Sequence, residues 1–294
     1  METDRGTEHQ QAAMSMSDQD EHALSPVSSN DTAVPADQNE NADAEIATDE
    51  SLHDQEDHPP SLILDLGTGS GIWAMQVADQ YPSAEVIGTD ISPVQPKWVP
   101  PNLQYEVDDL EQEWLFRDDC FDLIHVRFMF LSIKDWPGML RQAMRVLKPG
   151  GYIELSELDL RPVKVQDGSP EPATITQWFK LQGGAINHRG FDMQIAHKFK
   201  GLLEQAGFEA VVEEVRDVPW GTWPSDKRLK SIGFWHVEQL KQGLQGIAMA
   251  TLTRSGWSVA EVEVFLASLR REMSDPQYHI LDHAYIVYGR KPLS

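Results

Sequence analysis

A glycine-rich turn between a short apolar strand and a helix constrains the fold of this chain more than any other feature. The stretch LILDLGTGSGIWAMQVADQYPSAEVIGTDIS, residues 62–92, predicts a strand, a turn, a helix over Ile72–Gln80 and a second strand that ends in an acid. This order is typical of the βαβ unit of a doubly wound α/β fold. Such folds bind ligands beyond the carboxyl ends of their strands, so a ligand site is expected at that edge.

Short apolar runs continue to alternate with helical periodicity, which predicts a mostly parallel sheet. The expected strands are Leu62–Leu66, Glu85–Thr89, Leu103–Val107, Phe121–Val126, Gly151–Leu155, Val211–Val218 and Tyr285–Pro292. Further helices are expected over Pro137–Leu147, Thr174–His188, Ile195–Ala206, Leu229–Leu252 and Val259–Met273. LKPGG, residues 147–151, predicts a helix stop and a turn. The fold class is therefore α/β, with a doubly wound, seven-stranded, Rossmann-like sheet and helical insertions after the fifth strand.

The spacing of the glycines indicates which ligand the turn accepts. Gly67, Gly69 and Gly71 let the backbone turn tightly and let a ligand approach without a Cβ in the way. Dinucleotide sites use G-x-G-x-x-G, whereas this chain has G-x-G-x-G preceded by Asp65. A carboxylate at that position repels a pyrophosphate and suits a ligand that carries an ammonium and a sulfonium. An NAD-dependent oxidoreductase is therefore disfavoured.

Acidic residues also follow the second and third strands. Asp90 closes the second strand, 19 residues after Gly71, where a carboxylate can accept both hydroxyls of a ribose. The alternative for Asp90 is a helix-capping or turn role. Either Asp108 or Asp109 can accept the exocyclic amine of an adenine. Asp109 is the preferred candidate, and a solvated turn acid is the alternative.

The charge of the chain is unevenly distributed. The net charge is −23, and residues 1–60 hold 16 Asp or Glu, one basic residue (Arg5) and no Phe, Tyr, Trp or Cys. Such a segment cannot bury enough apolar surface to offset its ordering entropy. Residues 1–58 are therefore expected to be a disordered acidic tail, and residues 59–294 one domain. The tail is interpreted either as an interaction segment or as an inert solubilising one.

Composition argues against several classes of function. The chain has no Lys/Arg cluster for nucleic-acid binding, no secretory signal pattern and no apolar run near the ~18–20 residues of a membrane span. Cys120 is the single cysteine, which excludes an intrachain disulfide and a Cys-rich zinc site and predicts a buried structural thiol. The histidines are scattered and predict no metal site. An intracellular protein is expected, in the cytoplasm or the nucleus.

Taken together, the motifs resemble the class I S-adenosylmethionine-dependent methyltransferases. LDLGTGSG, the acid of IGTD, DDLE and LKPGG fall in that family's order and spacing. Four further stretches resemble a fungal branch related to the global regulator of secondary metabolism: GTDISPVQPKWVPPNLQYEVDDLEQEW, SIKDWP, PWGTWPSDKRLKSIG and YGRKP. The resemblance covers about residues 62–292. It departs in one place, because residues 1–60 show no counterpart of the "LPND"-like helical segment that usually precedes the first strand.

The resemblance implies S-adenosylmethionine as the cofactor and assigns its contacts. The implied cofactor-binding residues are Asp65, Gly67, Thr68, Gly69, Gly71, Asp90, Ile91, Asp108, Asp109 and His125. By this resemblance the glycine turn cradles the methionine end, Asp90 the ribose and Asp109 the adenine. His125, Val126 and Arg127 would face the sulfonium and the substrate mouth. For His125, ordinary hydrogen bonds at a strand end are an equal alternative.

The expected chemistry needs little from the protein beyond alignment and exclusion of water, because the cofactor carries the activated group. A hydroxyl acceptor would need a base, for which His125 and the His188 region are candidates. Trp178 and Trp223 are candidates to line an apolar pocket, whereas most of the other tryptophans are expected in the core. The predicted function is methylation of a small secondary metabolite. The alternative is a regulatory, protein-interacting relative with weak or no small-molecule turnover.

Overall fold

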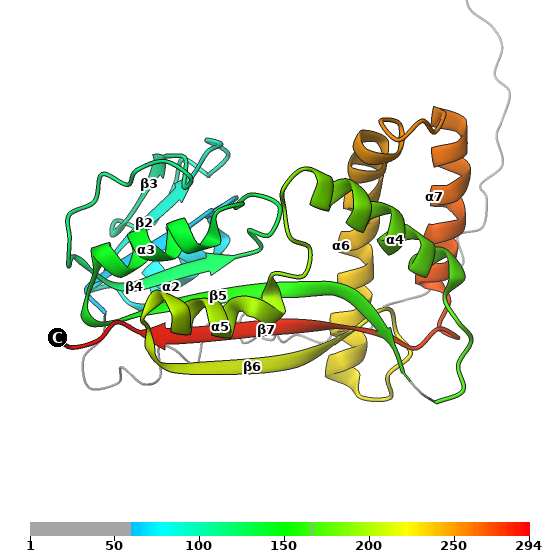
Figure 1. Ribbon diagram of the computed structural model, residues 1–294. Helices are drawn as coiled ribbons and strands as arrows, with labels where there is room; N and C mark the ends of the chain where they lie inside the picture. Colours follow the sequence, from blue (N-terminus) through cyan, green and yellow to red (C-terminus); the bar gives the residue numbers. More distant parts are fainter. Residues whose placement is uncertain (1–59, 166) are drawn as a thin grey trace, which may run out of the picture. The chain divides into compact units, whose positions relative to one another are not determined.

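A seven-stranded sheet forms the centre of the computed structural model, which describes residues 60–165 and 167–294. The strand order is β3-β2-β1-β4-β5-β7-β6 (Figure 1). The strands are β1 (Leu62–Leu66), β2 (Glu85–Asp90), β3 (Leu103–Val107), β4 (Phe121–Arg127), β5 (Leu147–Lys164), β6 (Glu209–Pro219) and β7 (Ile280–Arg290). β7 runs antiparallel to its neighbours β5 and β6, and the other neighbouring pairs are parallel. The predicted mostly parallel, Rossmann-like sheet is confirmed.

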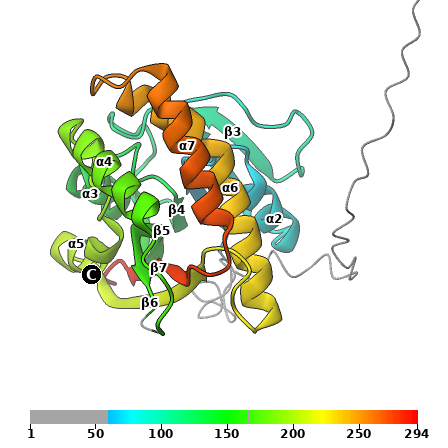
Figure 2. The same cartoon turned by 90° about the vertical axis from the view of Figure 1, so that its right-hand side faces the viewer.

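Helices cover both faces of this sheet. Alternate residues of each strand point to opposite sides, and apolar side chains on both sides pack against helices. Ile63 packs with helix α2 (Ile72–Gln80) on one face. Leu64 and Leu66 pack on the other face with α3 (Trp136–Val146) and α5 (Phe199–Ala206), which the short 3-10 helix η1 (Ala196–Lys198) precedes. Figure 2 shows α2 on the right of the sheet and α3 and α5 on its left. The carboxyl edge of the parallel strands is left for the loops.

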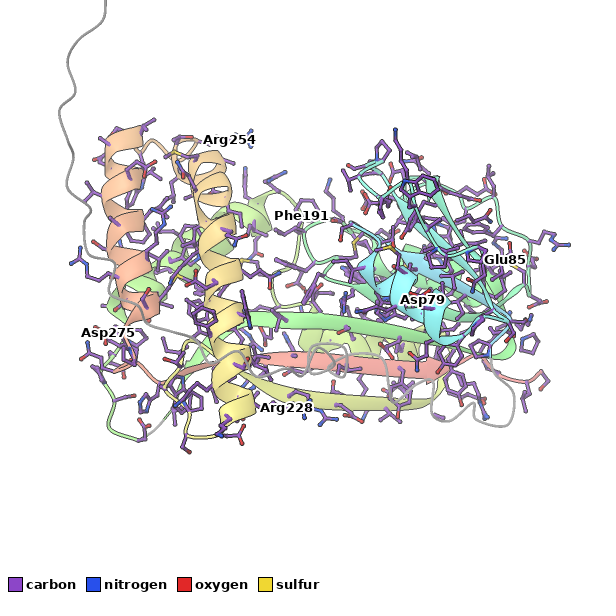
Figure 3. The ribbon with its side chains drawn as sticks, turned by 180° about the vertical axis from the view of Figure 1, so that it is seen from behind. Asp79, Glu85, Phe191, Arg228, Arg254 and Asp275 are labelled. Carbon is purple, nitrogen blue, oxygen red and sulfur yellow. The ribbon has the colours of Figure 1, made fainter. Side chains whose placement is uncertain are left out.

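Three further helices form a second apolar core near the far ends of the long strands β5, β6 and β7 (Figure 1). They are α4 (Ala173–His188), α6 (Lys227–Leu252) and α7 (Val259–Ser274). Figure 3 shows the length of α6, from Arg228 at its start to Arg254 just beyond its end. The backbone N–H of Ile175 donates to the buried carboxylate of Glu272 at 2.8 Å, which ties α4 to α7. These helices are the insertions that the sequence predicts.

The fifth strand differs most from the prediction. It was expected over Gly151–Leu155, yet β5 begins at Leu147 and includes LKPGG, the expected turn. The expected turn is nevertheless present inside this strand, because the pairing of Leu147 with Phe121 is followed by that of Tyr152 with Leu123, and Gly150 has a φ of +84°. The disorder expected for residues 1–58 lies outside the described residues.

Candidate active site

The glycine turn has free space on one side and contacts Tyr105 on the other. Gly69 and Gly71 have φ values of +56° and +81°, in the left-handed region that glycine adopts without strain. A Cβ on Gly71 would lie 2.0 Å from the hydroxyl oxygen of Tyr105 on β3, which donates a hydrogen bond to the Gly71 carbonyl. A Cβ on Gly69 would meet no atom closer than 4.0 Å. The open side of the turn is therefore at Gly69.

Hydrogen bonds from β2 fix the position of this turn. Thr68 N–H donates to the carbonyl of Thr89 at 2.9 Å. Asp90 accepts from the backbone N–H groups of Gly69 and Ser92, each at 2.9 Å. Asp90 thus braces the turn from the end of β2. Its carboxylate oxygens each keep a further acceptor position, as the ribose role predicted for Asp90 requires.

The structure places Asp65 and His125 beneath the turn, in the interior. They are paired residues on β1 and β4, so their side chains share the face that α2 covers. Asp65 is 3% exposed and accepts from His125 Nδ1 at 2.7 Å and from Thr68 Oγ1 at 2.6 Å. His125 is 1% exposed, and its ring stacks on Trp73 of α2 with centroids 3.7 Å apart. The expectation that His125 faces the substrate mouth is not met, because Trp73 covers its ring.

The remaining predicted site residues lie at the same edge, beyond β2 and β3. Ile91 follows Asp90 and is 69% exposed, which leaves an apolar side chain free to cover a flat ligand group. Asp108 N–H donates to the Asp90 carbonyl, and Asp109 accepts from the N–H of Glu111. Turn residues thus occupy part of the Asp109 carboxylate. Its adenine-binding role remains a prediction.

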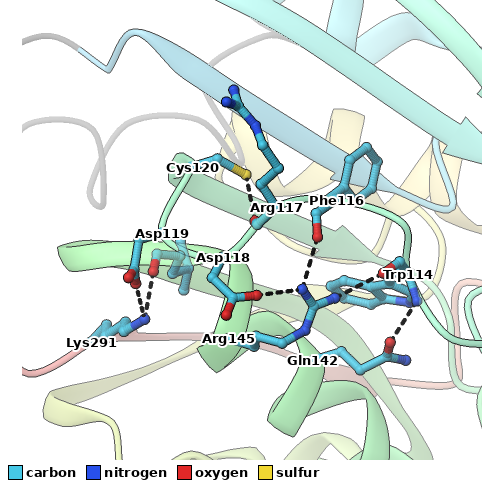
Figure 4. A network of polar contacts seen from close by, with 10 residues as sticks. Trp114, Phe116, Arg117, Asp118, Asp119, Cys120, Gln142, Arg145 and Lys291 are labelled. Carbon is cyan, nitrogen blue, oxygen red and sulfur yellow. Dashed lines mark hydrogen bonds and ion pairs between the residues drawn. The ribbon is translucent and has the colours of Figure 1, made fainter.

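Side chains of α3 hold the connection from β3 to β4 that follows Asp109 (Figure 4). Arg145 donates to the carbonyls of Trp114 and Phe116, both at 2.8 Å, and to the Asp118 carboxylate at 2.7 Å. Gln142 accepts from Trp114 N–H at 2.7 Å. Cys120, expected to be buried, is half-buried in this network, where burial raises the pKa of its thiol.

We expect Arg145→Ala to loosen this connection and to weaken cofactor binding severalfold. The change leaves two backbone carbonyls and Asp118 without the guanidinium, at a cost of about 1–3 kcal/mol for a partly exposed site. Urea unfolding measures the stability, and calorimetry measures the cofactor affinity. Arg145→Lys is the matched control, since it keeps the charge but not the fork of donors. Equal stability of the wild-type and Ala proteins would contradict this role.

The segment after β4 joins the glycine turn to the helical insertion. A Cβ on Gly67 would lie 2.2 Å from Sδ of Met129, so Met129 packs directly against the turn. The next residue, Phe130, donates its N–H to Glu157 of β5 at 3.0 Å. Burial raises the pKa of Glu157 to about 8, although the N–H groups of Leu158, Phe130 and Met129 favour its ionised form. Glu157 thus anchors this segment from the sheet.

The helical insertion contains a small apolar cavity of about 70 Å³. Trp178, predicted to line a pocket, is one of its walls. Trp223 is elsewhere and stacks on His279, and His188 is exposed at the end of α4. Gln182 and Trp220 also line the cavity and were not predicted. A polar residue on the apolar stripe of α4 was the available signal for Gln182.

Comparison with known proteins agrees with this arrangement. A family profile described as "Methyltransferase domain" matches residues 40–214. The chain belongs to the methyltransferase-domain family. S-adenosylmethionine-dependent methyl transfer is the reaction class of this family.

Three similar relatives in this methyltransferase family come from fungi. The chain is 36% identical over 241 residues to "Secondary metabolism regulator LAE1" of Cochliobolus heterostrophus, covering 81% of this chain and 78% of the relative. It is 34% identical over 235 residues to "Methyltransferase pytC" of Aspergillus terreus, with 78% and 71% covered. It is 30% identical over 244 residues to "Protein-methionine methyltransferase laeA" of Emericella nidulans, with 80% and 64% covered. The predicted fungal branch is confirmed.

Solved structures with a similar fold include Haemonchus contortus phosphoethanolamine N-methyltransferase 2 in complex with S-adenosyl-L-methionine, at a TM-score of 0.47 and 18% identity. That match covers 79% of this chain and 49% of the other.

Within residues 60–165 and 167–294, no group of His, Cys, Asp and Glu is arranged to hold a metal ion. In the same residues no helix is long and apolar enough to cross a membrane.

Proposed function

We propose that this chain binds S-adenosylmethionine at the carboxyl edge of β1, β2 and β3 and transfers its methyl group to a small acceptor molecule. The observation that carries this proposal is the open side of the turn at Gly69, beside the Asp90 carboxylate. A ligand can approach the backbone there, while the other side of the turn is filled by Tyr105. Protein atoms therefore fill the turn on the side of Gly71, and the side of Gly69 is left open for a ligand.

The residues around this cradle fit the proposed cofactor. The turn at Gly67, Gly69 and Gly71 would hold the methionine end, Asp90 the ribose and Asp109 the adenine, with Ile91 against the flat base. When bound, the cofactor supplies an electrophilic methyl group on a sulfonium. The segment Met129–Leu131 would exclude water from that side, since Met129 packs on the turn and Phe130 is anchored to Glu157. The buried Asp65–His125 pair would support the turn from below through Thr68.

A small acceptor is favoured over a protein by the cavity in the helical insertion. This cavity is lined mainly by aromatic and aliphatic side chains from α4, α6 and the segment after β4. A protein side chain must reach its site from an open surface, whereas a small apolar molecule can be surrounded. The second candidate function is modification of a protein, because relatives in the same branch carry the names of a secondary metabolism regulator and a protein-methionine methyltransferase.

Isothermal titration of S-adenosylmethionine and S-adenosylhomocysteine into the full chain tests the proposal. We expect both to bind with micromolar dissociation constants, in the range common for enzyme ligands. NADH serves as the control ligand, since the acidic turn disfavours a pyrophosphate. No heat of binding from either sulfur compound, in a chain that is folded by circular dichroism, would overturn the proposal.

A further inference from the structure

A buried carboxyl group attaches the segment after β4 to the sheet. Glu157 of β5 is 1% exposed, and its Oε2 accepts from the backbone N–H of Phe130 at 3.0 Å. Its Oε1 accepts from the N–H of Leu158 at 3.1 Å. Phe130 is 27 residues from Glu157 in the sequence, whereas Leu158 is adjacent to it. The bond to Phe130 therefore joins two separate parts of the fold.

The backbone enters this segment in a strained conformation. Phe128 has a φ of +56°, which a bulky residue adopts only when its surroundings hold it there. Its N–H donates at 3.1 Å to the carbonyl of Ser156, the residue before Glu157. Bonds to consecutive β5 residues therefore hold the chain in this conformation, which places Met129 against Gly67 of the turn. Loss of the bond to Glu157 would allow the strain to relax.

The ionised and protonated forms of Glu157 differ in how well they hold Phe130. An ionised carboxylate only accepts, and its hydrogen bonds are roughly twice as strong as those between neutral groups. A protonated carboxyl carries a hydrogen on one oxygen, yet both oxygens already face N–H donors. The strand fixes the N–H of Leu158 next to Glu157, so the bond to Phe130 is the one that yields. The ionised form therefore holds the segment, and the protonated form loosens it.

Burial favours the protonated form, since it raises the pKa of Glu157 to about 8 although backbone N–H groups act against it. On this side of the sheet α3 and α5 present apolar side chains. The titratable groups there come from β5, β6, β7 and η1: Asp159, Arg161, Glu213, Asp217, His283, Tyr285 and His197. Within the described residues none of them forms an ion pair with Glu157, which accepts its hydrogen bonds from the backbone. Near neutral pH, holding the segment therefore requires Glu157 to lose a proton.

We propose that Glu157 is a positioning residue for the cofactor site: its ionised form holds Met129–Leu131 against the glycine turn, and its protonation releases this segment and weakens binding of the methyl donor. This inference rests on the proposed function, because the segment lies beside the proposed cofactor turn. The ligand binds well only when Glu157 is ionised. Binding to a protonated chain therefore releases the proton of Glu157 to the solvent.

The test is calorimetric titration of S-adenosylhomocysteine into the full chain at pH 7 and pH 9, compared with Glu157→Gln, which cannot ionise. With a pKa of about 8, Glu157 is about one-tenth ionised at pH 7 and mostly ionised at pH 9. The apparent affinity scales with this fraction, so the wild-type affinity relative to the variant should rise about tenfold between the two pH values. The amino group of the ligand titrates with both proteins and cancels in this ratio.

Repeating the titration at pH 7 in phosphate and in Tris, whose heats of ionisation differ, counts the protons released on binding. We expect about one proton per ligand for the wild type and about none for Glu157→Gln. The amino group of the ligand is already mostly protonated at pH 7 and takes up few protons. Glu213→Gln is the matched control, since Glu213 is an acid on the same side of the sheet but on β6, which β7 separates from β5. It should keep the wild-type behaviour.

A purely structural Glu157 would lower the melting temperature of Glu157→Gln and leave the pH profile and the proton count unchanged. Parallel profiles without proton release would refute the role of Glu157 and leave the cofactor site intact. A lack of binding at both pH values, in a folded chain, would refute the proposed function as well. If Glu157→Gln does not fold, the proton count of the wild type decides alone.

Discussion

Gly69→Val is expected to reduce the affinity for S-adenosylmethionine at least a hundredfold while the fold is retained. The new side chain would enter the open side of the turn, where the nearest protein atom to the added Cβ is 4.0 Å away. The new Cβ therefore makes no clash, and the main stability cost is the backbone strain of a φ of +56°, on the order of 1–3 kcal/mol. Calorimetry measures the affinity, and thermal unfolding measures the stability.

Gly256→Val is the matched control for this strain. Gly256 has a φ of +95° and no atom within 4 Å of its added Cβ, in the connection between α6 and α7. Both variants should lose similar stability, but only the change at Gly69 should abolish binding. Retained affinity in the Gly69 variant would remove the glycine turn from the cofactor site.

His125→Leu is expected to destabilise the protein by about 3–5 kcal/mol, because it leaves the buried Asp65 carboxylate without its main partner. For a domain of this size the melting temperature should fall by roughly 6–20 °C. His125→Asn should recover about half of this loss, since its amide N–H can replace the bond from Nδ1 but not the ring contact with Trp73. Differential scanning calorimetry measures all three proteins.

A second His–Asp pair provides the comparison. His283 Nδ1 lies 3.0 Å from Asp217 in the same sheet, but both side chains are substantially exposed. His283→Leu should cost less than about 1 kcal/mol, as solvent screens exposed pairs. If His125→Leu left the melting temperature unchanged and removed methyl transfer, His125 would be a catalytic residue and its structural role would be wrong.

The parts of the site that depend on local sequence could be predicted. The bounds of β1, α2 and β3 follow from apolar periodicity, and the glycines fix the turn between β1 and α2. Asp90 is at the end of a strand whose length is set by its own apolar run. These features need no knowledge of distant residues.

The parts of the site that depend on packing between residues far apart in the sequence could not be predicted. His125 reads as a strand-end histidine until Trp73 of α2 is placed over it. Gln182 and Trp220 are 38 residues apart, and only the tertiary fold brings both to one cavity. In each case a partner from another element overrides the local signal.

The segment Met129–Leu131 forms a wall shared by two compartments, with Met129 on the glycine turn and Phe130 and Leu131 on the cavity. We expect occupancy of one compartment to change the free energy of filling the other, because both depend on the position of this segment. Because a thermodynamic cycle closes, any gain in acceptor affinity on loading the cofactor equals the gain in cofactor affinity on loading the acceptor. A protein with this wall reports through its apparent affinity for the methyl donor whether an acceptor is present.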